Sequence, residues 1–153
     1  PRLAAYLRRT LLMSNLATAP LIMAGLGLFC GAVLAFVTLH VGLGTFRPVT
    51  AERVEDHRMH SEWYRFSQGT ARAVNNAVTD GRRVVCIGTT SVRAVEGALR
   101  AGSGRIRPGD DWTDLFITPG FEFQGVGAML TNFHLPRSSL LLLVSAFGGR
   151  DLM

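Results

Sequence analysis

Three short polar segments carry the residue types best suited to chemistry. They read GTFRPV at residues 44–49, GTTSVR at residues 88–93 and TNFHLPR at residues 131–137. Each lies at or near the end of a run typical of a β-strand, and ligands of α/β folds bind beyond the carboxyl ends of strands. We therefore expect the three segments to meet at one sheet edge and to form a site.

The GTTSVR segment is suited to binding an anion. Thr89, Thr90 and Ser91 offer hydroxyl groups and backbone amides at the start of an expected helix, a place that favours negative charge. Arg93, one turn further on, can reach a carboxylate or a phosphate. A turn with a surface arginine is the simpler alternative.

The TNFHLPR segment predicts a polar loop that leads into a helix. Pro136 excludes a continuous helix through the segment, so Asn132 and His134 are presented on a loop. Arg137 lies beside the N-terminus of a helix expected over residues 140–147, which favours anions. A core helix preceded by an ordinary turn would give the same pattern.

A fourth segment, HRMHSEWY at residues 57–64, combines histidine, carboxylate and aromatic side chains. The Glu62 carboxylate beside aromatic rings suits a cationic ligand, and His60 supplies a base whose usual pKa is near neutrality. His57 and His60 could share a helical face. Without an HExxH pattern or a cysteine pair, we expect no metal site.

Strand and helix patterns alternate along most of the chain, which predicts an α/β fold. Ser67 is the expected cap of the first helix, and Ser138 or Ser139 that of the last. The expected strands cover residues 35–41, 83–87, 114–118 and 128–133, and the expected helices cover residues 68–79, 92–100 and 140–147.

Size and composition indicate a globular domain with an RNA-compatible charge. The chain has 153 residues, 48% of them hydrophobic, and a net charge of +5 in which all sixteen basic residues are arginine. Arginine binds phosphate bidentately. Cys30 and Cys86 lie in apolar surroundings without a CxxC pattern, which favours reduced thiols in a cytosolic protein.

The N-terminal region differs from the rest of the chain in composition. Residues 10–46 contain no acidic or basic side chain apart from His40, and residues 11–33 are long enough to cross a bilayer. The Ser, Asn, Pro and Gly residues within this stretch are tolerated in a membrane span, but they are equally compatible with the buried loops of an α/β fold.

Six ordered motifs give the chain a family resemblance. GTFRPV, MHSE, GTTSVR, WTDLFITPG, LTNFHLP and LLVSAFGG occur between about Val37 and Arg150. In this the chain resembles the S-adenosylmethionine:tRNA ribosyltransferase-isomerases of queuosine biosynthesis. The resemblance implies a cytoplasmic tRNA-modifying transferase and isomerase. Its co-substrate would be S-adenosylmethionine, its partner a tRNA carrying 7-aminomethyl-7-deazaguanine, and its product epoxyqueuosine, with no metal required.

The resemblance also suggests a role for each candidate residue. One histidine would remove a proton from the carbon next to the sulfonium, a carboxylate would orient that base or face the sulfonium, and hydroxyls with an arginine would bind the methionine carboxylate. Arginines and an amide would hold tRNA phosphate or a base edge. In the same order, the candidates are His60 or His134; Glu62; Thr89, Thr90, Ser91 and Arg93; and Arg47, Arg137 and Asn132.

Departures from the family pattern indicate a fragment. Residues 24–29 read AGLGLF, without the histidine of the family's AGLHFT, and Gly127 stands where an aspartate is usual. We expect residues 1–34 to be an atypical apolar segment, either a membrane span or degenerate sequence, and residues 35–153 to be an α/β core. Its sheet would be partial and barrel-like, with helices outside, incomplete relative to the family's larger domain.

Two other functions fit the same sequence. One is a membrane-anchored module with a span over residues 11–33, although we expect no membrane partner. The other is a module that binds tRNA or S-adenosylmethionine without catalysis.

Overall fold

The computed structural model describes residues 33–42, 45, 48–51 and 53–149. Within residues 36–153, which form one compact unit, the described part contains five strands, three α-helices and one 3-10 helix. They are β1 (Val37–Leu39), η2 (Val54–Asp56), β2 (Glu62–Phe66), α3 (Gln68–Thr79), β3 (Val84–Ile87), α4 (Thr89–Ala101), β4 (Gly109–Thr113), β5 (Val126–Leu130) and α5 (Ser139–Gly148).

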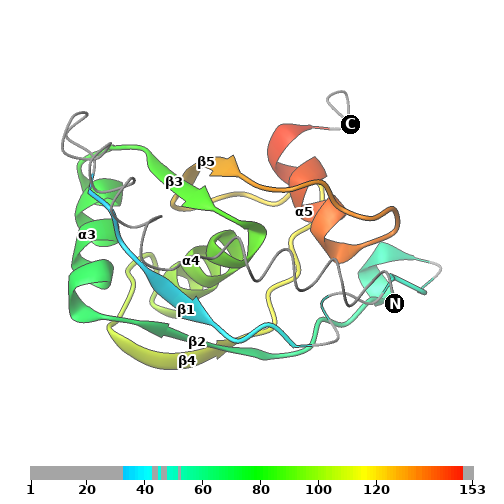
Figure 1. Ribbon diagram of the computed structural model, residues 1–153, viewed down its shortest axis with the longest axis horizontal. Helices are drawn as coiled ribbons and strands as arrows, with labels where there is room; N and C mark the ends of the chain where they lie inside the picture. Colours follow the sequence, from blue (N-terminus) through cyan, green and yellow to red (C-terminus); the bar gives the residue numbers. More distant parts are fainter. Residues whose placement is uncertain (1–32, 43–44, 46–47, 52, 150–153) are drawn as a thin grey trace, which may run out of the picture. The chain divides into compact units, whose positions relative to one another are not determined.

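The strands form two separate sheets with α4 between them (Figure 1). The first is antiparallel in the order β1-β2-β4, and the second pairs β3 with β5 in parallel. Helix α4 contacts β1 and β4 of one sheet and both strands of the other. The predicted α/β class is confirmed. Neither described sheet closes on itself, so the barrel-like arrangement stays a prediction.

Helix α4 supplies much of the hydrophobic core. Val92, Ala94 and Leu99 on this helix are fully buried, and Phe66 of β2 and Ile117, in the loop after β4, pack in the same cluster. The approach to β4 is close because α4 has a glycine there: a Cβ on Gly97 would lie 2.5 Å from Thr113 Oγ1.

The capped helices begin where the sequence predicts. The Ser67 side chain accepts a hydrogen bond from the Thr70 amide at 3.1 Å, and Ser138 accepts one from the Leu141 amide at 3.2 Å. These bonds satisfy amides that have no partner within the first turn of a helix. Helices α3 and α5 and strand β3 are confirmed, whereas α4 begins at Thr89, three residues before the predicted start.

One predicted strand is wrong. Residues 114–118 form no strand; β4 lies at Gly109–Thr113 instead, in the stretch expected to be a connector. Four of its five residues are exposed, so this edge strand carries no apolar alternation. Its pairing with β2 determines its position, and such a tertiary contact is not visible in local sequence.

The predictions for the N-terminal region concern residues that, for the most part, the structure does not describe. Almost all of the expected segment 1–34, including the span over 11–33, lies outside the described residues. Among the residues that are described, no helix combines the length and apolar character needed to cross a bilayer.

Candidate functional site

Two of the three polar segments start side by side because β3 and β5 are parallel neighbours. Ile87 and Leu130, the last residues of these strands, are register partners. The Gly88 amide then donates a 2.7 Å hydrogen bond to the Leu130 carbonyl. This bond joins the start of GTTSVR to the start of the TNFH loop, as the sequence predicts for strand ends at one sheet edge.

The first segment is also tied to the third. The Val49 amide donates to the Arg137 carbonyl at 2.8 Å, and Pro48 forms an isolated bridge with Ser138. The Ser139 hydroxyl donates to the Thr45 carbonyl at 3.2 Å. Thr45, Pro48 and Val49 therefore lie against the beginning of α5.

A buried ion pair links these segments to β2. Arg93 Nη1 pairs with Glu62 Oε2, and only 3% of Arg93 and 1% of Glu62 is exposed. The other carboxylate oxygen, Oε1, accepts from the Gly42 amide at 2.9 Å and from the Thr45 hydroxyl. Both oxygens of Glu62 are thus occupied, and the cluster holds the start of the GTFRPV segment.

The Arg93 guanidinium keeps one unmet donor. Its Nε donates to the Leu115 carbonyl at 3.2 Å, and Nη1 also lies 3.5 Å from Thr45 Oγ1. Its Nη2 is buried and has no hydrogen-bond partner in the described structure. Leaving a buried donor unpaired costs about 1–3 kcal/mol, more for a charged group, so an added acceptor would bring a net gain.

The hydroxyl residues before Arg93 lie in the first turn of α4, not in a loop. Thr89 is buried and Thr90 is half-buried. Ser91 Oγ donates to the Ile87 carbonyl at 2.8 Å, which fixes the end of β3 against the helix. The backbone amides of this turn keep the polarity that favours an anion.

The TNFH loop presents a partly shielded histidine between exposed neighbours. His134 Nε2 lies 3.0 Å from Thr131 Oγ1, and burial lowers the pKa of His134 below its usual 6.5. Asn132 is exposed and Phe133 is completely so. Arg137 is exposed with a positive φ of 57°, in the left-handed region.

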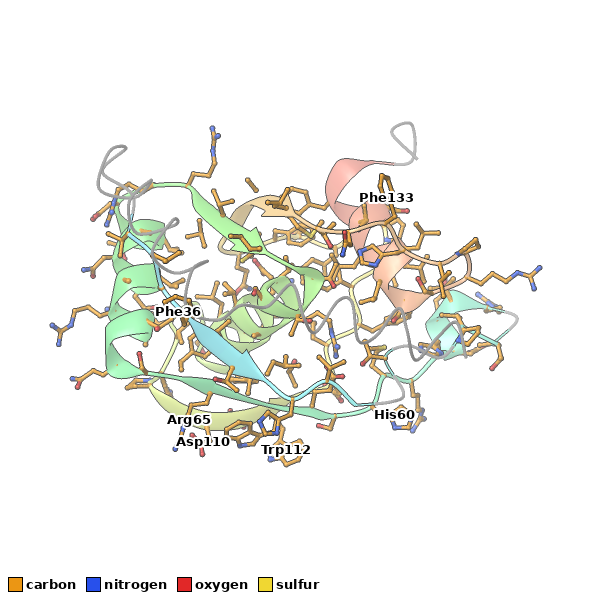
Figure 2. All side chains as sticks on the ribbon, in the orientation of Figure 1. Phe36, His60, Arg65, Asp110, Trp112 and Phe133 are labelled. Carbon is orange, nitrogen blue, oxygen red and sulfur yellow. The ribbon has the colours of Figure 1, made fainter. Side chains whose placement is uncertain are left out.

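His60 is not brought to this loop. It is exposed just before β2, and Figure 2 shows it at the lower edge of the view, with Phe133 at the upper edge beside α5. The two histidines considered as bases therefore belong to different regions of the molecule. Arg47 lies outside the described residues.

Sequence reasoning missed two buried polar residues, Thr45 and Glu96. Thr45 joins Glu62 to Arg93; the GTFRPV motif indicates the segment that contains Thr45 but not this contact. Glu96 is fully buried and accepts from the amides of Gln124, Gly125 and Val126 at 2.9–3.0 Å. Because Glu96 is spaced as if on the apolar face of α4, that spacing could have indicated a buried carboxylate. The described residues contain no cluster of three or more His, Cys, Asp or Glu that could hold a metal ion.

Known proteins match most of the chain. The family described as queuosine biosynthesis protein matches residues 29–153. The S-adenosylmethionine:tRNA ribosyltransferase-isomerase of Natranaerobius thermophilus is 54% identical over 123 residues, which are 80% of this chain and 36% of that protein. The crystal structure of S-adenosylmethionine tRNA ribosyltransferase from Thermotoga maritima matches with a TM-score of 0.56 and 38% identity, covering 79% of this chain and 36% of that one. The chain thus spans little more than a third of these relatives.

Proposed function

Because the chain belongs to the queuosine biosynthesis protein family, we propose that it carries part of the site at which the ribosyl group of S-adenosylmethionine is transferred to tRNA. The acceptor is the amine of 7-aminomethyl-7-deazaguanine, and transfer with isomerisation gives epoxyqueuosine. The supporting observations are the pairwise contacts that join the three polar segments, and the buried Nη2 of Arg93, which has no acceptor among the described residues. The proposed reaction would take place in the cytoplasm, where tRNA is modified.

Arg93 is the proposed binding residue for the methionine carboxylate. A carboxylate oxygen would supply the acceptor that Nη2 lacks, while Glu62 and the Leu115 carbonyl hold the guanidinium in place. Thr89 and Thr90 would add hydroxyl or amide contacts from the first turn of α4, and Ser91 would hold that turn to β3. In this arrangement Glu62 positions Arg93 and does not face the sulfonium.

His134 is the better supported base of the two histidines. Its loop begins beside the GTTSVR segment, whereas His60 lies elsewhere, and its lowered pKa keeps the ring neutral at neutral pH. His134 would accept a proton from the 5′-carbon next to the sulfonium. Adenine then leaves, the amine of the modified base bonds to the ribosyl group, and an epoxide closes as methionine departs.

The exposed residues around this loop suit the tRNA partner. Asn132 would meet a base edge, and Arg137 with Arg47 would hold phosphate or the modified base. We also propose that the two small sheets belong to a larger barrel-like sheet in the longer relatives. The sheet edges that are open in the described part of this chain support that view.

Adenine release tests the reaction in the full-length Natranaerobius thermophilus relative. Replacing the histidine that matches His134 by Ala should slow release by about 100-fold or more, because a general base contributes about 10²–10⁴-fold. The matched change at His60 should leave the rate near normal. The reverse result would move the base to His60, and normal rates for both would remove histidine from this step.

Ligand binding tests the Arg93 assignment in this chain. Arg93→Lys keeps the charge but removes the planar fork, so S-adenosylmethionine should bind at least about tenfold more weakly, while methylthioadenosine, which lacks the carboxylate, should be unaffected. Equal weakening of both ligands would contradict a carboxylate contact. Tight binding without adenine release would instead indicate a non-catalytic module.

A further inference from the structure

A second surface, on the outer side of the β1-β2-β4 sheet, has a composition of its own. On β2, Glu62, Tyr64 and Phe66 are buried while Trp63 and Arg65 alternate with them. Trp63 pairs directly with Trp112 of β4, and Arg65 with Asp110. We call His40, Trp63, Arg65, Asp110 and Trp112 the aromatic face. Figure 2 shows Arg65, Asp110 and Trp112 along the lower edge of the view, away from α4.

The aromatic face is prearranged by its own contacts. The His40 ring lies 4.7 Å from the Trp63 ring in an edge-on orientation, and the Arg65 guanidinium carbon lies 5.8 Å from the Trp63 ring centre. Trp112 is left 61% exposed. A large, rigid aromatic ring that is exposed to solvent near a cationic side chain can stack on another ring. It loses little conformational entropy when it does so.

The charges on this face leave cationic donors available. Arg65 Nε donates to Asp110 Oδ1 at 2.7 Å, which neutralises the Asp110 carboxylate. Within the described residues, neither Nη of Arg65 donates a hydrogen bond. Those donors and His40 therefore suit an anionic group that approaches the rings.

The exposed side chains of the other sheet differ in chemistry from those of the aromatic face. Its exposed side chains are aliphatic: Val85 and Ile87 on β3, and Leu130 on β5. Such a surface suits packing against protein. The aromatic face instead offers ring faces with cationic donors, which match unpaired nucleobases and the phosphates between them.

We propose that the aromatic face binds single-stranded RNA, with a base stacked on Trp112 and a phosphate held by Arg65. The inference rests on the proposed function, which supplies a tRNA with an exposed anticodon loop.

Intrinsic fluorescence tests the proposal directly, because Trp63 and Trp112 are the chain's two tryptophans. Titration of the whole chain with a short oligoadenylate should give saturable quenching. A blunt RNA duplex, whose bases are not available for stacking, should give much weaker quenching. Heparin, a polyanion without bases, should give none; equal quenching by heparin or duplex would overturn the stacking proposal.

Variants with matched controls separate stacking from general effects. Trp112→Ala should weaken oligoadenylate binding about 5- to 100-fold, and Trp112→Phe should largely restore it. Ile87→Ala, a similar truncation on the other sheet, should leave binding unchanged. Arg65→Ala should weaken binding and flatten its salt dependence, whereas Arg82→Ala, from the exposed Arg82–Asp80 pair, should not.

The outcome of these RNA-binding experiments does not depend on whether the proposed ribosyl transfer takes place. Unchanged binding by Trp112→Ala, measured with a labelled oligoadenylate, would overturn the aromatic face whatever the enzyme assay gives. Oligoadenylate binding that depends on Trp112, found together with no adenine release in the full-length relative, would support the face and refute the proposed reaction.

Discussion

Glu96 shows how one buried side chain can determine both local structure and reactivity. Three backbone amides from residues 124–126 satisfy its carboxylate and fix the entry to β5. Burial, and then the charge of Glu96, raise the pKa of Cys86 to about 12. The Cys86 thiol therefore stays protonated near neutral pH and is a poor nucleophile.

At the same scale, the environment of His134 sets a pH dependence. Burial lowers its pKa below 6.5, so the neutral, base-competent ring persists to lower pH than an ordinary imidazole would allow. The half-point of adenine release by the full-length relative should therefore lie below pH 6.5, on the acidic side of an ordinary imidazole. A pH–rate profile measures this, and a half-point above 6.5 would contradict His134 as the base.

The same shift affects stability with a defined sign. Because the unfolded chain takes up the His134 proton at a higher pH than the folded chain, stability is lost as pH falls from about 6.5 towards the lowered value. His134→Gln should remove this dependence. Urea unfolding at several pH values, compared between the two proteins, is the control for the rate profile.

At the scale of elements, local signals predicted some boundaries and missed others. Ser67 and Ser138 side chains satisfy first-turn amides, so the starts of α3 and α5 could be identified from sequence. The exposed strand β4 could not, since only its pairing with β2 places it. The meeting of the GTTSVR and TNFH segments follows from the rule that carboxyl ends of parallel strands share one sheet edge. The Glu62–Arg93 pair joins different elements, and no local spacing reveals it.

Close packing between α4 and β4 gives a test at this scale. Gly97→Ala would bring a Cβ within 2.5 Å of Thr113 Oγ1, so we expect the free energy of unfolding to fall by about 1–3 kcal/mol. Gly69→Ala in α3 meets nothing nearer than 3.8 Å and should leave stability unchanged or raise it by up to about 1 kcal/mol. Urea denaturation measures both; equal effects would contradict the close approach.

At the scale of the whole molecule, the chain covers 36% of the proteins it resembles and leaves apolar surface exposed. Val85, Ile87 and Leu130 share one uncovered face of the parallel sheet, and they are more than half exposed. Exposed apolar patches of this kind promote association. In longer relatives, other parts of the protein would be suited to cover this face.

A charge placed on that face should reduce self-association. Ile87→Lys removes an exposed apolar side chain, and we expect association of the chain to weaken by about tenfold or more, since burying such a side chain contributes about 1.5–3 kcal/mol. Thr79→Lys adds the same charge at an exposed site of α3 and serves as the control. Sedimentation across a concentration series measures both variants, and equal changes would show that net charge alone is responsible.

The neutralising pair of Glu62 and Arg93 constrains how this sequence can evolve. Losing either member alone would strand an isolated charge in the interior, a penalty of about 3–5 kcal/mol, comparable to the entire stability of many domains. Single changes that remove the charge at either position are therefore strongly disfavoured. Homologous genes should keep both residues or exchange both together, and an inherited change in one should be accompanied by a compensating change in the other.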